Sequence, residues 1–276
     1  MISARSGMVL VLGGLCAMAC SESGLKMKDG GRLAGKILTV DSSGDAGRHV
    51  TLRLDLNDQA HMVYTDEANQ ALKYVTQSSA GFAMSTVDDS CKNCPYSGLE
   101  MDANNDPHVI YFNESNKTLT YAYRQDNQWM KEPVEWGQGN GMGAQLLFDE
   151  AGGLHALYYS GDGYLKHAWR VVRTAEQLAE LKRDALKAAR EKARRARKRG
   201  KKAPGPSELR VDEPPVGIWG NERVDKANGS EKVQISFVRQ PNERLAASYL
   251  HWSGLSSEPR LAVQGEGGQW STEVVA

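Results

Sequence analysis

The chain has 276 residues, 25% charged and 40% apolar, with 28 glycines, a composition typical of a globular, turn-rich protein rather than a disordered or fibrous one. Its 34 Lys/Arg balance 34 Asp/Glu, and only the N-terminal region contains a long apolar run, so the composition disfavours an integral membrane protein. The roughly 250 residues behind that run are enough to form one repeat domain with a substantial core.

Residues 1–19 are predicted to be a signal peptide, because a positive charge precedes the apolar run Met8 to Ala19, which is too short to span a membrane. An Ala-x-Ala sequence lies directly before Cys20 and allows two interpretations. It fits ordinary signal cleavage, and it resembles the lipobox of bacterial lipoproteins, which implies that Cys20 becomes a lipid-modified N-terminus. We favour lipidation, with residues 20–34 as a linker. The residue after Cys20 is Ser21, and in this respect the sequence resembles lipoproteins that are sent to the outer membrane. The alternative is a secreted or periplasmic protein.

The phrase Asp-x5-His-x2-Tyr occurs three times at a fixed period of 47 residues. A period in the forties, built from short alternating segments, predicts a blade-type β repeat. Because the phrase recurs, its residues are predicted to have structural roles, whereas catalysis needs one asymmetric constellation. The three copies are Asp55, His61 and Tyr64; Asp102, His108 and Tyr111; Asp149, His155 and Tyr158.

Each repeat contains four predicted strands. The first two form a hairpin around the Asp and His, a third follows, and a fourth begins at a large residue such as Phe82 or Trp129. This pattern predicts an all-β propeller of four-stranded blades. Residues 35–172 would hold blades one, two and part of three, and residues 216–276 the remainder of blade three and the last blade.

The number of blades is less directly determined. The last repeat keeps its strand pattern but lacks the Asp and the His, as terminal repeats often do. One additional outer strand, ending at Asp41, precedes the first repeat. The count fits a four-bladed ring with a surplus strand or a partial fifth blade; we favour four, closed by pairing strands from both chain ends. His61, His108, His155 and Ala246 should then occupy equivalent positions.

Residues 173–215 interrupt blade three between its third and fourth strands and are predicted to form a basic helix with a Pro-rich exit. Thr174 and Gln177 form a capping-box pattern, and the helix should continue to Gly200. Within it, Lys182 to Lys202 contains 12 Lys/Arg and two Asp/Glu, a net charge of +10.

This helix could bind an anionic partner or simply be a solvated basic helix. It lacks interleaved aromatic residues and a large apolar face, which disfavours nucleic acid and membrane insertion. Candidate partners are an acidic glycan, an anionic lipid head group or an acidic protein, including the propeller itself with the helix across one face. The basic residues predicted to bind are Arg190, Arg194, Arg195, Arg197, Lys198 and Arg199.

Cys91 and Cys94 lie in the loop between blades one and two. In an oxidising compartment this spacing most simply predicts a local disulfide, and two free thiols or a redox or metal site are the alternatives. A metal site would need two further ligands, and the repeated Asp turns lose their calcium-like oxygens in the third copy. We therefore predict neither a metal nor a cofactor.

Blade two shows the fullest repeat, Leu99-x-x-Asp102-x-Asn104-x-x-Pro107-His108-x-x-Tyr111. It resembles the repeats of uncharacterised secreted bacterial propeller proteins, loosely grouped with sialidase-like and other BNR-type propellers. The resemblance covers most of residues 35–276 and implies the fold. The Asp-boxes of true sialidases are absent, so sialidase chemistry is not carried over to any residue.

Two functions remain. The first is a non-enzymatic cell-envelope module that binds a glycan or protein, and the repetition of the most conspicuous His and Tyr residues favours it. The alternative is a polysaccharide-acting glycoside hydrolase or lyase with its site at the central channel. Candidate acids for the alternative are Glu100, Glu114, Glu132 and Asp162, all expected at the surface.

Overall fold

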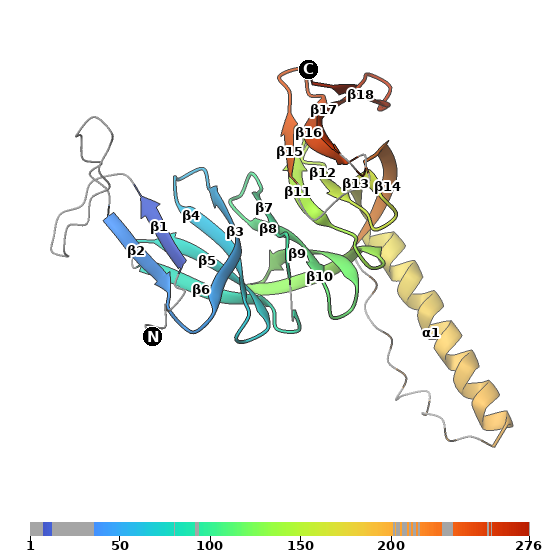
Figure 1. Cartoon of the computed structure of the whole chain (residues 1–276). Coiled ribbons are helices and arrows are strands. Elements are labelled where there is room, and N and C mark those ends of the chain that lie inside the picture. Colours follow the sequence, from blue (N-terminus) through green and yellow to red (C-terminus); the bar gives the residue numbers. More distant parts are fainter. Residues whose placement is uncertain are drawn as a thin grey trace, which may run out of the picture.

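The structure is a computed structural model and consists mainly of four four-stranded antiparallel sheets, which follow one another along an arc (Figure 1). In each sheet the strands are in sequence order, so every sheet is one blade. The predicted all-β fold with four-stranded propeller blades is confirmed. The residues described by the structure are 8–12, 36–79, 81–91, 94–200, 202, 205, 209, 211, 214, 216–227, 234–252, 254 and 256–275.

The blades correspond to the predicted repeats. Blade one contains β3 (Ala46–Leu54), β4 (Ala60–Asp66), β5 (Ala71–Ser78) and β6 (Gly81–Asp88). Blade two contains β7 (Gly98–Met101), β8 (Pro107–Asn113), β9 (Thr118–Gln125) and β10 (Gln128–Trp136). Blade three contains β11 (Met142–Phe148), β12 (Leu154–Tyr159), β13 (Tyr164–Val172) and β14 (Gly217–Lys226). Blade four contains β15 (Ile235–Arg239), β16 (Leu245–Trp252), β17 (Ser257–Gln264) and β18 (Trp270–Val274).

The surplus outer strand is present as β2 (Lys36–Asp41), but it does not close a ring. It pairs with β1 (Met8–Leu12) in a separate two-stranded sheet, whereas the sheet of blade four contains only β15 to β18. Our expectation that strands from both chain ends pair is therefore wrong for the described residues. β1 also falls inside the predicted signal peptide. Cys20 lies outside the described residues, so cleavage and lipidation remain predictions.

The core lies between the blades. All seven residues of β4 are buried, because a second strand is covered on both faces of its blade, whereas half of the outer strand β6 is exposed. One core cluster joins blade one to blade two through residues such as Val63, Leu72 and Val109. Similar clusters join blades two and three, and blades three and four. Each blade is thus stabilised mainly by its neighbours.

The predicted equivalence of the second strands is also observed. His61, His108 and His155 are each the second residue of their strand and pair with Arg53, Glu100 and Leu147, which are themselves 47 residues apart. Ala246 occupies the same place in β16 and pairs with Val238. The repeat alignment made from sequence is therefore correct in all four blades.

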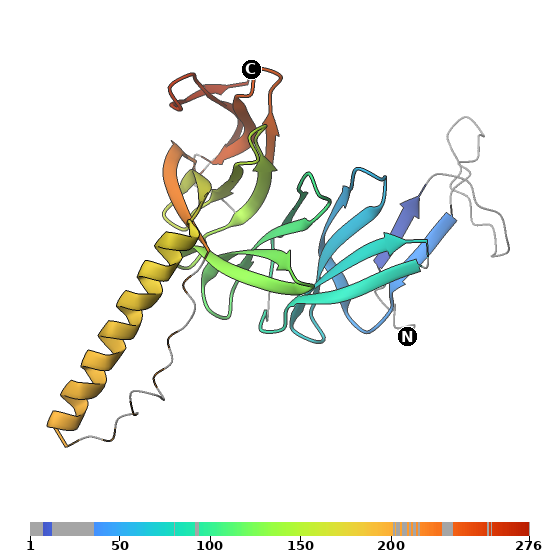
Figure 2. The same ribbon diagram turned by 180° about the vertical axis from the view of Figure 1, so that it is seen from behind.

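The inserted helix α1 (Ala175–Lys198) begins at the predicted capping box, with Thr174 and Gln177 bonded reciprocally. β13 pairs with β14 at its base, and the Arg173 N–H donates to the Val216 carbonyl over 2.8 Å. The helix points away from the sheets in both views (Figures 1 and 2). It does not lie across a face of the propeller, which was one of the alternatives. Among the described residues, no helix is both long and apolar enough to cross a membrane.

Candidate ligand-binding site

The repeated Asp and His residues hold each first hairpin to its third strand. One carboxylate oxygen of Asp55 accepts backbone N–H bonds from Asn57 and Gln59, both at 2.8 Å. Its other oxygen lies 3.4 Å from Nε2 of His61, whose Nδ1 lies 2.5 Å from the Tyr74 hydroxyl. Because the Asp caps its own turn, the calcium-like pattern of the sequence is explained by backbone hydrogen bonds.

Blade two repeats this arrangement. Nδ1 of His108 lies 2.5 Å from the Tyr121 hydroxyl, and Nε2 lies 3.7 Å from Asp102. The Asp102 carboxylate accepts N–H bonds from Asn104 and Asp106 at 2.9 and 2.8 Å. The recurrence in space as well as in sequence supports a packing role for both histidines.

Blade three departs from the repeat because His167 replaces the tyrosine. Nε2 of His167 lies 2.9 Å from Nδ1 of His155, and its Nδ1 lies 2.9 Å from Glu222. His155 in turn contacts Asp149 over 3.2 Å. The series Asp149–His155–His167–Glu222 contains three contacts, and each needs one proton. Two neutral imidazoles carry only two protons. Burial lowers the pKa of His167 and so disfavours a further proton on that ring. Within the described ranges, no group of three or more His, Cys, Asp or Glu is arranged to hold a metal ion.

The repeated tyrosine connects consecutive blades. Each donates its hydroxyl to a carboxylate at the end of the preceding outer strand, and we call this contact the latch. The pairs are Tyr64–Asp41 at 2.6 Å, Tyr111–Asp88 at 2.7 Å, Tyr158–Glu135 at 2.7 Å and Tyr249–Asp225 at 2.6 Å. Burial and the adjacent Asp88 raise the pKa of Tyr111, so the phenol keeps the proton that it donates. The first latch uses β2, which therefore takes the place of an outer strand of a preceding blade.

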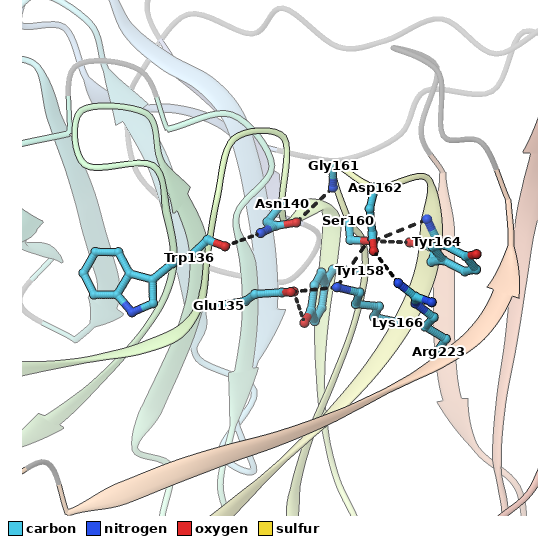
Figure 3. Close-up of polar contacts among 10 residues, drawn as sticks. All are labelled: Glu135, Trp136, Asn140, Tyr158, Ser160, Gly161, Asp162, Tyr164, Lys166 and Arg223. Carbon is cyan, nitrogen blue, oxygen red and sulfur yellow. Dashed lines mark hydrogen bonds and ion pairs between the residues drawn. The ribbon is translucent and has the colours of Figure 1, made fainter.

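A basic side chain completes most latches. Lys166, the cross-strand partner of Tyr158, lies 2.6 Å from Glu135 (Figure 3). Arg260 has the same place beside Tyr249 and lies 2.8 Å from Asp225. In blade two that position is Thr120, and the charge comes instead from Lys131 on β10, 3.0 Å from Asp88. Three of the four latches thus pair the carboxylate with a cation, although the strand that supplies the cation changes.

Asp162, one of the candidate acids for catalysis, is engaged in structural contacts. Asp162 accepts hydrogen bonds from Ser160 and, over 3.1 Å, from Arg223 beside the third latch (Figure 3). Burial raises its pKa, but these bonds and Lys166 outweigh burial and lower the pKa below its ordinary value.

Glu132 was expected at the surface, and that expectation is wrong, because the residue is only 3% exposed. Arg170 holds it through two hydrogen bonds of 2.8 Å, and the Gly217 N–H adds a third at 2.9 Å. Glu100 lies 3.4 Å from Arg53, and Glu114 is half-buried in the turn between β8 and β9. The structure does not bring the four candidate acids together.

The cysteine pair stabilises the junction between blades one and two. Cys91 and Cys94 are disulfide-bonded, with Cα atoms 5.7 Å apart, and both side chains are buried in the core between these blades. The Cys91 N–H donates to the Gln70 carbonyl, and the Thr65 hydroxyl donates to the Cys94 carbonyl, both at 3.0 Å. These bonds fix the connecting loop to blade one.

All six basic residues predicted to bind an anionic partner are exposed, five on α1 and Arg199 at its C-cap. Arg195 forms an ion pair with Glu191, and Ala193 is the buried residue of the helix. A 24-residue helix extends about 36 Å, so these charges are displayed well outside the blades. The structure therefore allows binding to a large anionic surface.

A cavity of about 560 Å³ lies where the first strands of the four blades meet. The residues of its walls occupy equivalent positions in the repeats. The 47-residue period relates these positions in blades one to three, and the strand register relates them to blade four. The first position contributes His49, Tyr96, Gly143 and Gln234. The second contributes Val50, Ser97, Ala144 and Ile235, and the third contributes Thr51, Gln145 and Ser236.

These wall residues differ from blade to blade, unlike the repeated Asp, His and Tyr. Ser248, Tyr249, Leu250 and Pro259 of blade four complete the wall, and Tyr249 is also the tyrosine of the fourth latch. The residues that line the described pocket include no Asp, Glu, Lys or Arg. Hydroxyl and amide groups beside aromatic rings can bind an uncharged, hydrogen-bonding ligand. The cavity is within the usual size of small-ligand sites.

None of these residues was predicted from the sequence as part of a site. The predicted residues are those that recur with the same side chain, whereas the pocket is lined by equivalent positions whose side chains differ. The 47-residue period relates 49 to 96 and 143, and that spacing was the signal that could have identified the wall. No sequence feature indicated that the first strands border a pocket.

The sheets, their order and the latches define a β-propeller-type repeat protein with a central pocket. No family model matches the chain, and no curated protein matches it. Among solved structures, a protein of unknown function from Dyadobacter fermentans is 9% identical, with a TM-score of 0.48, covering 94% of this chain and 75% of that one.

Two glycan-acting enzymes are also similar at this level. A GH43 β-1,3-galactosidase is 10% identical, with a TM-score of 0.47 and coverages of 87% and 80%. An exo-β-1,3-galactanase from Phanerochaete chrysosporium is 10% identical, with a TM-score of 0.45, and the chain spans 50% of its length. At such identities the likeness does not bear on activity. Neither enzyme is a sialidase, and the resemblance to BNR-type repeats rests on the sequence motif alone.

Proposed function

We propose that the protein is a non-catalytic cell-envelope binding module whose central pocket takes a neutral glycan. The observation that carries this proposal is the set of unlike, uncharged polar side chains at equivalent positions around one cavity. A binding site needs such asymmetry, whereas the repeated Asp–His–Tyr contacts are used in packing. Glycoside hydrolysis generally uses a pair of carboxylates, and the lining contains neutral groups instead.

Gln145→Ala should weaken glycan binding by about tenfold, because it removes an amide that can hydrogen-bond to ligand hydroxyls inside the pocket. Isothermal titration calorimetry with a panel of neutral glucose, galactose, mannose and xylose trisaccharides would measure the loss. Gln128→Ala, at an exposed position on β10, is the matched control and should leave the affinity unchanged.

The same panel separates binding from catalysis. Release of reducing ends, or of unsaturated products, would favour the alternative of a glycoside hydrolase or lyase acting at the central channel. Failure of every saccharide to bind would contradict the pocket proposal altogether.

We further propose that Cys20 carries the lipid that attaches the protein to the outer membrane. The support is the small-residue sequence before Cys20 and the polar segment that follows it. In a diderm bacterium, Cys20→Ala should move the protein from the membrane to the soluble fraction, as measured by fractionation and immunoblotting. Continued membrane association of the variant would point to another anchor; secretion or a periplasmic location is the alternative address.

The projecting helix α1 is proposed as a second contact point, for an acidic glycan, an anionic lipid head group or an acidic protein. Its six exposed basic residues and its separation from the blades support this role. Lipid anchoring would keep the helix near an anionic envelope surface, where electrostatic attraction is strongest.

A further inference from the structure

One wall position of the pocket has an unusual backbone conformation in three consecutive blades. His49, Tyr96 and Gly143 have φ values of +53°, +66° and +67°. The left-handed region suits glycine, which blade three uses, and is unfavourable for bulky side chains. Blades one and two therefore keep aromatic rings where the backbone favours glycine. The fold itself gives no reason for those rings, since blade three adopts the same conformation without one.

The two rings lie beside each other on the pocket wall. Their centroids are 5.8 Å apart and their planes are inclined by 47°. His49 is exposed and Tyr96 is half-buried, so the pair is accessible to a ligand.

The strands that carry the rings are tied together. The Thr51 hydroxyl donates to the Ser97 carbonyl over 2.5 Å, and the Ser97 hydroxyl donates to the His49 carbonyl over 3.3 Å. These bonds fix the two ring-bearing segments relative to each other, so the backbone that carries the rings is positioned before any ligand arrives. Pre-positioned groups bind without an ordering cost.

We propose that His49 and Tyr96 form a stacking platform for the apolar face of a neutral pyranose ring. This inference rests on the proposed function and names the part of the pocket that gives it its specificity. A pyranose has a C–H face that packs on aromatic rings and a rim of hydroxyls that hydrogen-bonds to uncharged polar groups. Gln145, Gln234 and Ser236 supply such groups on the other walls of the same cavity.

Backbone strain provides a test that separates binding from structure. Tyr96→Gly and His49→Gly place at each site the residue that blade three already uses. Each should lower saccharide affinity at least about tenfold while the thermal unfolding temperature stays equal or rises, because glycine relieves the positive φ. Tyr96→Phe keeps the ring and should bind within about twofold of the native protein.

The matched control is Lys117→Gly, at an exposed turn position with φ +58° outside the pocket. It should show the same thermal response with no change in affinity. The binding probe is whichever neutral trisaccharide of the panel binds the native chain most tightly, followed by calorimetry and saturation-transfer NMR.

The outcomes are distinguishable. If the native chain binds no saccharide, the proposed function fails before the platform is tested. If the native chain binds and both glycine variants bind equally well, the platform is wrong while the pocket proposal stands. A lower unfolding temperature in the glycine variants, together with unchanged affinity, would assign the rings to packing.

Discussion

Asp88→Ala should lower the free energy of unfolding by about 3–5 kcal/mol, the usual cost of removing one partner from a buried charged contact. Asp88 is 3% exposed and accepts from the Tyr111 hydroxyl at 2.7 Å, the Asn113 amide at 3.0 Å and the Lys131 ammonium at 3.0 Å. The variant leaves these donors, and the Ser90 hydroxyl and N–H that also donate to Asp88, without their acceptor between blades one and two. Urea unfolding followed by circular dichroism would measure the change.

Asp89→Ala is the matched control, because Asp89 is the exposed neighbour of the latch residue. It should change the free energy of unfolding by less than about 0.5 kcal/mol. Tyr111→Phe, which removes only the hydroxyl, should have an intermediate effect. Equal losses for Asp88→Ala and Asp89→Ala would contradict a stabilising role for the latch.

The contribution of Asp88 should also depend on pH in a defined direction. Burial raises its pKa, but the hydrogen bonds from Tyr111, Ser90 and Lys131 outweigh burial and hold the pKa below its ordinary value. A carboxyl with a depressed folded-state pKa stabilises the protein above its unfolded pKa of about 3.9 and loses that contribution as the pH falls. The difference between the native protein and Asp88→Ala should therefore be constant near neutral pH and shrink below about pH 4.

Neutralising six basic residues at the C-terminal end of α1 and its cap should weaken binding to anionic vesicles or heparin at least about 100-fold at low salt, since each cation near an anionic surface contributes about 1 kcal/mol. The variant replaces each of them by glutamine, which keeps the helix propensity. Native binding should fall steeply from low to physiological salt, because exposed charges are screened over about 8–10 Å. The residues replaced are Arg190, Arg194, Arg195, Arg197, Lys198 and Arg199.

The matched structural variant replaces residues 174–215 by a short Gly/Ser linker. Its thermal unfolding temperature should be nearly native, because β13 and β14 already hold the ends of the insertion together and loop-closure entropy varies slowly with length. Comparing heparin with vesicles of anionic lipid separates a glycan partner from a lipid one. Binding that survives both the deletion and high salt would move the site to the blades, and a large loss of stability would show that α1 packs as structure.

The sequence by itself determined the blade. Strand patterning depends on local alternation, and the 47-residue period repeats that alternation with the same turns, so four-stranded sheets follow from short-range chemistry. The capping box at Thr174 and Gln177 likewise determined where α1 begins, because both partners lie within one turn of the chain. The Asp turns were also local, and their carboxylates bond to N–H groups two to four residues away.

Only the tertiary structure decided how the blades meet and what they enclose. Glu132 was expected at the surface, but Arg170, 38 residues later in the chain, buries and pairs it. The strand β2 pairs with β1 and not with blade four, which no local pattern could specify. The pocket joins His49 to Gln234 across four blades. Contacts of this kind depend on the rotation between successive sheets, and packing between blades sets that rotation. The hydrophobic pattern that forms each blade is nearly independent of the rotation.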